Sequence, residues 1–504
     1  MVLMLVKLEK ERQNMKKSNA SFFTSGSFDV KDLLALNLFD LSGKKTKTKG
    51  TSNKNYCIEI NVNKTNNKAQ IYCIYGAVGG TQTSYWMLFD DYLSAKKEYD
   101  KIIKSKKRKG YKEIDVAQRA FGSEEAKKIT KAVQLTNVDP SIKKPSISLH
   151  VETQRLITEL MGATNNFVIQ TLKCPLGQLT NQQIEAGRDR LKEAEQIVAK
   201  ARKSQNDKDR IEELTNDFYS LIPHNLGMGS RGQLTHLLLD SKDKINAKEY
   251  DLDTLLDAKA IGATLVSDST YDQYASLDTN FNFIDHTNPL FKWIDKMIQH
   301  TRASNHRYLG KIVLLNAWEI ERKTERDNFL KTTNKIAGEC GKQVIPSQLK
   351  RLVPERTDVY DEKLFKNANV IPLFHGTRTQ NITGILKKGI LIRPSGVVIT
   401  GAMYGSGAIY KSPSASKSIN YTNIKTSYWA KGNDDKAYLF ISDCTLGNQL
   451  MASGPRNYTL KNIAPNHSVW AKGGQSGVIN DEMMLYRTDQ HNLRYLLEFT
   501  CQKN

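Results

Sequence analysis

Three segments in the C-terminal part of the chain carry side chains that can act as acids, bases or hydrogen-bonding groups. His375 follows the apolar run Val370–Phe374, and Tyr410 follows a loop that contains two glycines. Glu482 precedes three apolar residues. Each lies on a short β-branched or aromatic segment between turn-rich stretches, a pattern that predicts strands. Strands bring distant residues to one cleft, so we expect these side chains to line one binding site.

The short motifs around these residues agree in order and in spacing. His-Gly-Thr at 375–377 comes first, and Tyr410 and Tyr421 follow, 11 positions apart (421 − 410). Ser-Lys-Ser-Ile-Asn-Tyr occupies 416–421, and Glu482 comes last. Together these motifs resemble those of the diphtheria-toxin-like ADP-ribosyltransferases, and within them those of the poly(ADP-ribose) polymerases. The resemblance depends on the conjunction of the motifs and not on any one of them.

The resemblance implies a cleft that binds NAD as a substrate and breaks the bond between nicotinamide and ribose. Breaking this bond develops positive charge on the sugar, so a fixed negative charge beside the ribose lowers the barrier. By resemblance, Glu482 holds a hydroxyl of the nicotinamide ribose and polarises the acceptor hydroxyl. His375 is expected to donate to a hydroxyl of the adenosine ribose, and Tyr410 to pack against nicotinamide. Glu482, His375 and Tyr410 are thus the expected catalytic residues, and the last two also bind NAD.

Five further positions are expected to bind NAD on the same resemblance. The backbone of Gly376 and the hydroxyl of Ser418 match the positions that hold the carboxamide. Tyr421 matches the residue that stacks on the nicotinamide ring. Thr377 supplies a hydroxyl beside the histidine, and Arg393 begins the expected donor loop, which ends at Thr400.

Other chemistries fit this sequence less well. A single histidine at a strand end or a tyrosine beside glycine more often has a structural role, so each residue alone would favour that interpretation. Gly405-x-Gly407-x-x-Tyr410 lacks the third glycine of a dinucleotide-binding loop and has no βαβ unit around it. The six cysteines lie far apart with no Cys-x-x-Cys, which excludes an ordinary zinc finger and offers no disulfide framework. No metal is therefore expected.

Length and charge limit the remaining possibilities. The 504 residues are too many for one ordinary core, so we expect three folded units with linkers. The formal charge of +21 favours a polyanionic partner, because neutralising phosphates releases their counterions. We therefore expect nucleic acid as a partner, with a solubilising surface as the alternative. No apolar run approaches the roughly 20 residues that span a bilayer, so we expect an intracellular protein with no membrane partner.

The N-terminal third of the chain changes character near residue 50. Residues 1–50 mix lysine with serine and asparagine, which predicts a basic, largely disordered tail with at most a short helix near Val30–Leu38. Alternating β-branched and aromatic runs then predict three strands and a helix, at 56–62, 69–75, 84–89 and 92–103. This order resembles a WGR domain, a small sheet-plus-helix module found beside the catalytic unit in DNA-dependent polymerases of the family.

The namesake motif of that module is altered here. Tyr75-Gly76-Ala77 stands where Trp-Gly-Arg is usual, so Tyr75 can still stack but Ala77 lacks the guanidinium. A run of basic residues next to Gly110-Tyr111 can contact phosphate in its place. These residues are Lys101, Lys104, Lys106, Lys107, Arg108 and Lys109.

Residues 140–275 are predicted to be mainly helical. Thr180 and Gln183 form a capping-box pattern that opens a helix, and further apolar periodicities predict helices at 211–221 and 250–265. Three strings resemble the regulatory helical domain of the family, at 173–179, 218–224 and 255–257. The resemblance implies a domain that covers the NAD cleft and unfolds locally when DNA is bound, so that deleting residues 140–275 would raise activity without DNA.

The catalytic part is predicted to begin near Leu277. The sequence there favours an amphipathic helix at 289–299, a strand at 311–318 and a charged helical stretch at 319–335. Pro372 cannot donate a ladder hydrogen bond, which predicts that the strand carrying His375 lies at a sheet edge.

These observations predict a multidomain α+β protein. Its expected parts are a basic tail (1–50), a WGR-like DNA-binding domain (51–135), an all-α regulatory bundle (140–275) and a mixed α/β ADP-ribosyltransferase domain with a split antiparallel sheet (277–504).

The resemblance implies an NAD-dependent protein poly-ADP-ribosyltransferase stimulated by DNA strand breaks. Its acceptors would be protein side chains, including its own, and it would reside in the nucleus of a eukaryotic host, or otherwise in the cytoplasm or nucleoid. Two alternatives remain: a mono-ADP-ribosyltransferase of the same fold, and a catalytically weak scaffold that binds DNA ends.

Overall fold

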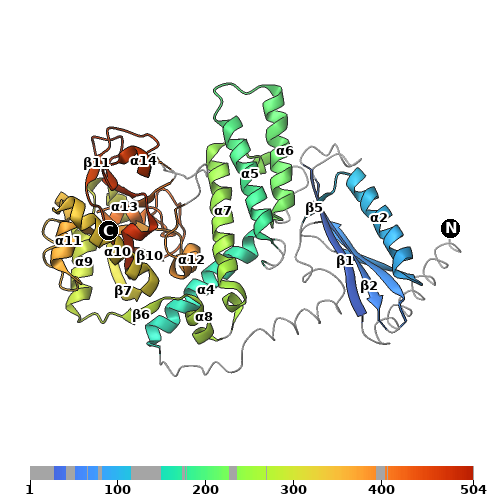
Figure 1. The fold of residues 1–504 in the computed structure, drawn as a ribbon, viewed down its shortest axis with the longest axis horizontal. Coiled ribbons are helices and arrows are strands. Elements are labelled where there is room, and N and C mark those ends of the chain that lie inside the picture. The colour runs from blue at the N-terminus through green and yellow to red at the C-terminus, as the bar shows by residue number, and fades with distance from the viewer. Residues whose placement is uncertain are drawn as a thin grey trace. The chain divides into compact units, whose positions relative to one another are not determined.

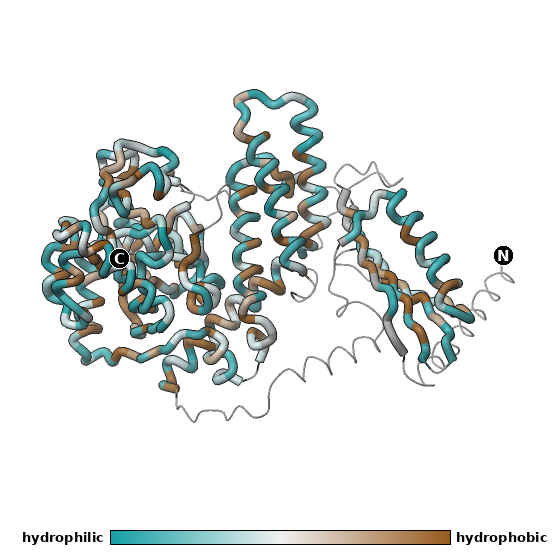
Figure 2. Tube along the Cα trace, in the orientation of Figure 1, coloured by the Kyte–Doolittle hydropathy of each residue, from teal (hydrophilic) through white to brown (hydrophobic). Residues whose placement is uncertain are grey.

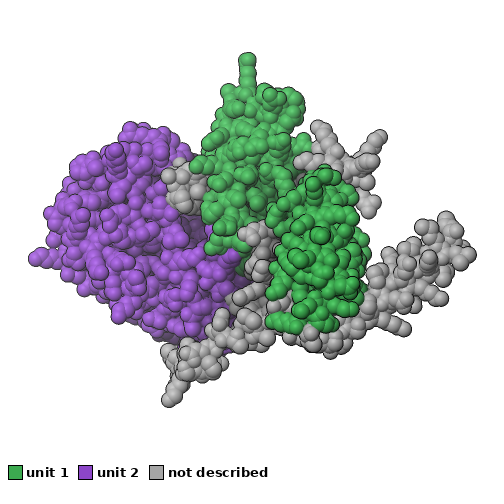
Figure 3. Space-filling view, turned by 45° about the vertical axis from the view of Figure 1, so that its right-hand side comes forward, with its two compact units in different colours: residues 1–146, 168–252 green, residues 147–167, 253–504 purple. Residues whose placement is uncertain are grey.

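The chain divides into two compact units. The structure, a computed structural model, describes residues 28–40, 52–64, 66–77, 82–114, 149–172, 176, 179–225, 235–267, 269–392, 403–405 and 407–502. One unit comprises residues 1–146 and 168–252, and the other comprises residues 147–167 and 253–504 (Figure 3). Two helices, α4 (Val151–Thr171) and α7 (Lys242–Ile261), each contribute to both units.

A five-stranded sheet with one helix forms the N-terminal part of the first unit (Figure 1). The strand order is β4-β3-β2-β1-β5. The elements are β1 (Phe28–Asp40), β2 (Ser52–Asn63), β3 (Ala69–Ala77), β4 (Gln82–Phe89), α2 (Tyr92–Arg108) and β5 (Lys112–Ile114). Asp91 caps α2 by accepting from the backbone N–H of Ser94 at 2.8 Å. The three predicted strands and the helix are confirmed.

The predicted helix near Val30–Leu38 is wrong, because this segment is the middle of strand β1. Leu36 and Leu38 are buried and lie two positions apart, which is the period of a strand face. β1 pairs antiparallel along the whole of β2, so the sheet supplies hydrogen bonds that a short helix would lack. The WGR-like sheet therefore includes a strand from the segment that we expected to be a tail.

Within the first unit, α5 (Asn181–Val198), α6 (Gln205–Leu221) and the N-terminal part of α7 form a helical bundle. The capping box is confirmed: Thr180 Oγ1 accepts from Gln183 N at 3.0 Å, and Gln183 Oε1 accepts from Thr180 N at 2.8 Å. The helix predicted at 250–265 begins earlier, at Lys242, and gives way to a 3-10 turn at Gly262–Val266.

The second unit contains two sheets. The first has the order β6-β7-β14-β10-β8, and the second has the order β11-β12-β13-β9. The strands are β6 (Asn280–Phe283), β7 (Lys311–Glu321), β8 (Val370–Gly376), β9 (Ile409–Lys411), β10 (Lys436–Thr445), β11 (Gln449–Met451), β12 (Ser468–Ala471), β13 (Glu482–Leu485) and β14 (His491–Gln502). All pairs are antiparallel except β11 with β12, which confirms the predicted split sheet in a mixed α/β domain.

Seven α-helices lie entirely within the described part of this unit. They are α8 (Thr270–Ser276), α9 (Pro289–His300), α10 (Lys323–Cys340), α11 (Glu362–Asn367), α12 (Ile382–Lys388), α13 (Ala415–Ile419) and α14 (Leu460–Ile463). The predicted helix at 289–299 is confirmed, whereas 319–321 still belongs to strand β7. Figure 2 shows hydrophobic and hydrophilic residues alternating along strands and helices, the pattern of elements that bury one face.

Strand β8 lies at the edge of its sheet, as Pro372 predicts. Beyond that edge, Phe374 and Ser412 exchange two backbone hydrogen bonds, of 2.9 and 3.1 Å. This bridge joins the end of β8 to the residue after β9 and so links the two sheets where His375 and Tyr410 lie. Within the described ranges, the structure contains no helix with the length and apolarity needed to cross a membrane.

Candidate active site

The three predicted catalytic residues lie on neighbouring strands. His375 ends β8, Tyr410 is the middle residue of β9, and Glu482 begins β13. β9 and β13 pair antiparallel, with Tyr410 opposite Met484. The bridge beyond β8 brings His375 beside β9, so segments more than a hundred residues apart (482 − 375 = 107) meet at the junction of the two sheets.

His375 is held by one backbone contact. Its Nδ1 lies 3.1 Å from the carbonyl oxygen of Tyr410, which can only accept, so Nδ1 carries the proton. Burial, with the charge of Lys411 as the second cause, lowers the pKa of His375 to about 3. The ring is therefore neutral at physiological pH and its Nε2 is an acceptor. The donor role expected from the resemblance does not fit this tautomer, which would instead accept a hydrogen bond from a ligand hydroxyl.

The hydroxyl of Tyr410 fixes the loop before β9. It accepts from the backbone N–H of Tyr404 at 2.9 Å and donates to the carbonyl of Gly405 at 2.9 Å. Burial is the main cause that raises the pKa of Tyr410 above its ordinary value, so the phenol stays neutral. Because its hydroxyl is hydrogen-bonded within the protein, Tyr410 can contact a ligand through the face of its ring.

Glu482 is buried, and one of its two carboxylate oxygens has a partner among the described residues. Its Oε1 pairs with Lys417 Nζ at 2.7 Å, and the same ammonium donates to the carbonyl of Asn480 at 2.9 Å. Its Oε2 is buried with no hydrogen-bond partner among the described residues. A buried carboxylate oxygen without a donor is costly, so this atom is the natural acceptor for a hydroxyl of a bound substrate.

The tyrosines around Glu482 respond to its charge. Burial is the main cause that raises the pKa of Tyr421, and the negative charge of Glu482 adds to it. The same charge also contributes to the raised pKa of Tyr410 and of Tyr404. The charge of Glu482 therefore affects the pKa of both predicted aromatic residues, Tyr410 and Tyr421.

Gly376 and Ser418 form a tight backbone contact beside His375. A Cβ at Gly376 would lie 1.8 Å from the carbonyl oxygen of Ser418, so only glycine fits there. That carbonyl also accepts from the backbone N–H of Tyr421 at 3.1 Å. Thr377 Oγ1 accepts from Asn381 Nδ2 at 3.2 Å. The expected residue Arg393 and its loop lie outside the described residues.

Gly376→Ala should abolish the NAD binding that the sequence resemblance implies for this site. The added methyl group would force the strand end and the Ser418 turn apart by more than an ångström, because backbone and not a flexible side chain lies in its path. Isothermal titration with NAD should show no binding to the variant. Gly407→Ala is the matched control, since a Cβ there meets none of the described residues within 4 Å and should leave affinity unchanged. Equal affinity in wild type and G376A would show that the close backbone contact between Gly376 and Ser418 is not needed for binding.

One further residue supports the site and was not found by sequence reasoning. His306 lies in the 3-10 segment Ser304–Leu309, with Nδ1 2.9 Å from Ser416 Oγ and Nε2 3.3 Å from Asn480 Nδ2. Because Asn480 also accepts from Lys417, these contacts form a chain from His306 to the Lys417–Glu482 pair. No motif surrounds His306 in the sequence, so only the fold could place it here.

Helix α7 reaches the edge of the site. Thr254 Oγ1 lies 2.6 Å from Asn381 Oδ1, and Asn381 in turn donates to Thr377. One turn further along α7, Asp257 packs on Gly384. A Cβ added at Gly384 would lie 2.2 Å from the carboxyl carbon of Asp257. Burial raises the pKa of Asp257 to about 6. Both contacts lie within the second unit.

The WGR-like sheet uses its aromatic residues internally. Tyr75 stacks on Tyr56 with ring centroids 5.7 Å apart, and Lys106 Nζ lies 3.8 Å from the centroid of Tyr56. Lys106, one of the expected phosphate contacts, is thus held by its own domain. Lys104, Arg108 and Lys109 of the same basic run are exposed. The side chain of Ala77 lies outside the described residues.

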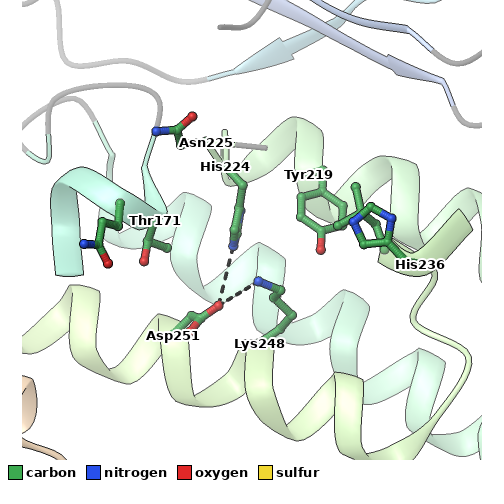
Figure 4. A pocket seen from close by; sticks show the side chains of 9 residues that line it. Thr171, Tyr219, His224, Asn225, His236, Lys248 and Asp251 are labelled. Atoms are coloured by element: carbon green, nitrogen blue, oxygen red, sulfur yellow. Dashed lines mark hydrogen bonds and ion pairs between the residues drawn. The ribbon is translucent and has the colours of Figure 1, made fainter. Parts of the chain in front are cut away.

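A separate polar cavity lies in the helical bundle (Figure 4). It measures about 290 Å³ and none of the predicted site residues lines it. Asp251 Oδ2 lies 2.8 Å from Lys248 Nζ and 3.7 Å from His224 Nε2. Among the described residues, no group of three or more metal-ligating side chains could hold an ion.

Comparison with known proteins accounts for most of the chain. The family model of the poly(ADP-ribose) polymerase catalytic domain matches residues 290–501. The model of the poly(ADP-ribose) polymerase regulatory domain matches residues 148–281, and the WGR domain model matches residues 39–118.

Several known proteins are similar in sequence. The chain is 25% identical to Poly [ADP-ribose] polymerase 2 of Homo sapiens, over 92% of this chain and 79% of that protein. It is 28% identical to Poly [ADP-ribose] polymerase 1 of Gallus gallus, over 68% of this chain but 32% of that protein. With Poly [ADP-ribose] polymerase 2 of Zea mays the identity is 24%, over 64% of this chain and 48% of that protein.

Proposed function

Because the chain belongs to the poly(ADP-ribose) polymerase family, we propose that it is an NAD-dependent protein poly-ADP-ribosyltransferase stimulated by broken DNA. The proposal rests above all on Glu482. Its buried Oε2 has no hydrogen-bond partner among the described residues and can accept a hydrogen bond from a bound substrate. The matched WGR, regulatory and catalytic regions in this order support the dependence on DNA.

The site residues divide the work on NAD. Glu482 accepts a hydrogen bond from a hydroxyl of the nicotinamide ribose and places a negative charge beside the sugar. The sugar becomes cationic in the transition state, so the stabilisation by Glu482 is greatest there. His375 Nε2 accepts a hydrogen bond from a hydroxyl of the adenosine ribose. Tyr410 and Tyr421 pack on nicotinamide with their rings. The remaining contacts to NAD are made by Gly376, Thr377, Arg393 and Ser418.

A direct test uses labelled NAD and the full chain with nicked plasmid DNA. We expect release of nicotinamide and labelled polymer on the protein, both reduced when the plasmid is covalently closed. Product length on a gel distinguishes polymer from a single ADP-ribose, the mono-transferase alternative. No nicotinamide release with nicked DNA, where a known polymerase is active, would overturn the proposal and favour a DNA-binding scaffold.

The partners follow from the same proposal. The WGR-like sheet and its exposed basic residues bind DNA at strand breaks, and the acceptors are proteins, including this chain. If the host is eukaryotic, the protein acts in the nucleus; otherwise it acts in the cytoplasm or nucleoid. The excess of positive charge, +21, supports a polyanionic partner in either case.

The C-terminal half of α7 restrains the site. Thr254 reaches Thr377 through Asn381, so a shift of α7 would release a residue that is proposed to bind NAD. A deletion of residues 140–275 tests this poorly, because it also removes Arg155 and Glu159. Arg155 pairs with the buried Glu498, and Glu159 pairs with Lys436 at 2.7 Å, so the deletion would leave a buried carboxylate short of partners.

Thr254→Ala should raise activity without DNA by about fivefold, since one hydrogen bond of about 1 kcal/mol that holds α7 is lost. Initial rates of nicotinamide release, with and without nicked DNA, measure the effect. Thr264→Ala is the control, because the hydrogen bond that its hydroxyl donates, to the carbonyl of Ile261 at 2.8 Å, stays within the same short segment. If T254A and T264A have the same basal rate as wild type, α7 does not restrain the site through this contact.

A further inference from the structure

Two adjacent aromatic residues, Tyr428 and Trp429, are exposed in the middle of the loop 425–433 of the second unit. They are 62% and 59% exposed, and their rings meet at 90° with centroids 4.8 Å apart. Within the described ranges, no cation lies over either ring. Large aromatic side chains that stand together in solvent commonly mark an interaction site.

The loop is closed at its base by backbone contacts. Ile424 and Asp434 form a parallel bridge, and Lys425 N donates to the carbonyl of Asp434 at 2.9 Å. A Cβ at Gly432 would lie 2.0 Å from the carbonyl oxygen of Asn423, so the two sides of the loop are in direct contact. A backbone fixed in this way holds the two rings in place before a ligand arrives, which lowers the entropy cost of binding.

The buried residue Asn420 ties this loop to a third exposed aromatic residue, Tyr308. Its Oδ1 accepts from the hydroxyl of Tyr308 at 3.0 Å and from the backbone N–H of Tyr428 at 2.8 Å. Tyr308 lies in the 3-10 segment Ser304–Leu309 and is 48% exposed. One oxygen atom thus joins two segments that lie more than a hundred residues apart (428 − 308 = 120). We call Tyr308, Tyr428 and Trp429 the aromatic surface.

Basic residues surround the aromatic surface. Arg307 directly precedes one of its rings and Lys431 follows another by two positions. Both are exposed, and neither pairs with a carboxylate among the described residues. Two further guanidinium groups reach the same segments: Arg302 donates to the carbonyl of Arg307 at 3.2 Å, and Arg378 donates to that of Ala430 at 3.4 Å.

Two acids follow the loop and offset part of this charge. Asp435 pairs with Lys425 at 2.6 Å, and Asp434 is exposed. The basic groups outnumber them, so the surroundings of the rings are positive. Exposed rings among cations are the combination that binds single-stranded nucleotide chains, because the rings stack on bases and the cations pair with phosphates. A double helix would hide its bases, and an apolar protein partner would not need the cations.

We propose that the aromatic surface binds the growing ADP-ribose polymer, with adenine stacked on its rings and pyrophosphate paired with the surrounding cations. This choice of ligand rests on the proposed function, which produces a chain whose every unit carries an adenine and a pyrophosphate. The place of the surface favours this ligand: its anchor, Asn420, directly precedes Tyr421, which is proposed to pack on nicotinamide. A polymer held here stays beside the site and is extended further before release.

Fluorine NMR of the full chain, made with fluorotryptophan, tests the proposal at the ring itself. The chain has five tryptophans, and Trp429→Phe identifies the signal of Trp429. This signal reports stacking locally, so polyanions that bind elsewhere on this basic chain do not obscure it. A purified ADP-ribose oligomer should shift the signal at lower concentrations than single-stranded oligodeoxyadenylate or polyglutamate does.

The other probes decide between ligand classes. No shift with the ADP-ribose oligomer would overturn the proposal. An equal or stronger response to oligodeoxyadenylate would assign the surface to single-stranded DNA, and a response to polyglutamate would assign it to acidic peptides. Either result would overturn the choice of the polymer.

Two variants and one control separate stacking from charge in the same titration. Tyr428→Ala should weaken binding of the oligomer by about tenfold, within the usual contribution of one base–aromatic stack. Arg307→Gln should lower the slope of log affinity against log salt by about 0.7 if it removes one phosphate contact. Leu460→Ala is the control, since it removes another exposed apolar side chain of the unit, 45% exposed, and should leave the titration unchanged. Unchanged titrations in both Y428A and R307Q would overturn the proposal.

Polymer length supplies the second reading, with NAD and nicked DNA. Trp429→Ala should produce shorter polymer than wild type, and W429F should restore the length, because phenylalanine keeps a ring that can stack. The initial rate of nicotinamide release should be the same in all three proteins. Equal polymer lengths in wild type and W429A would overturn the proposed retention of the polymer. No nicotinamide release from wild type would instead overturn the proposed function, and the oligomer titration would still decide whether the surface binds this ligand.

Discussion

Glu482→Gln is expected to reduce the rate of nicotinamide release by about a hundredfold to a thousandfold, the usual loss when a group that stabilises transition-state charge is removed. Glutamine keeps the size of the side chain and removes the negative charge beside the ribose. Its amide can still accept from Lys417 but leaves that buried ammonium without a counter-ion. We expect the loss mainly in kcat, because the charge acts most strongly as the sugar becomes cationic.

The neighbouring Asp481 provides a matched control for this change. Its carboxylate accepts from the backbone N–H of Gly473 at 2.7 Å and lies 3.4 Å from Gln348 Nε2, so both oxygens have structural partners. Asp481→Asn removes the same charge one residue away and should change the rate far less than E482Q. Equal losses in both variants would indicate that local stability, and not the position of the Glu482 charge, controls the reaction.

Arg356→Ala is expected to destabilise the second unit by about 3–5 kcal/mol, the usual result of breaking a buried ion pair from one side. The guanidinium is buried and pairs with Asp443 of β10, whose carboxylate is fully buried. It also contacts Asp358 at 2.7 Å, and Arg494 pairs with that carboxylate at 2.7 Å. Removing the cation would leave Asp443 charged in the interior with one fewer partner.

Chemical unfolding of the full chain, followed by circular dichroism, measures the loss. Lys425→Ala is the control, because its pair with Asp435 at 2.6 Å joins side chains that are 51% and 87% exposed. Exposed pairs contribute about 0–1 kcal/mol, so this variant should unfold close to wild type. If R356A unfolds at the same denaturant concentration as K425A, the buried network does not hold β10 in place.

Local sequence patterns predicted the elements that depend on short-range physics. The capping box at Thr180 could be read from two residues three positions apart, because both hydrogen bonds of the motif are local. Pro372 predicted an edge strand, because its missing N–H excludes a central position. The segment around Val30–Leu38 was misassigned, because its strand depends on pairing with β2, whose partner residues lie 16 (54 − 38) to 31 (61 − 30) positions further along, and not on its own propensity.

Motifs and their spacing were enough to identify the residues available for chemistry: a histidine, two tyrosines and a glutamate in motifs that together point to NAD. How these residues act could be seen only from their arrangement in three dimensions. It joined β8 to β9 beside His375, left Glu482 Oε2 without a donor among the described residues, and brought His306 and Thr254 to the site. The reason is that charge state and hydrogen-bond direction are set by burial and by neighbours across strands, which spacing along the chain does not encode.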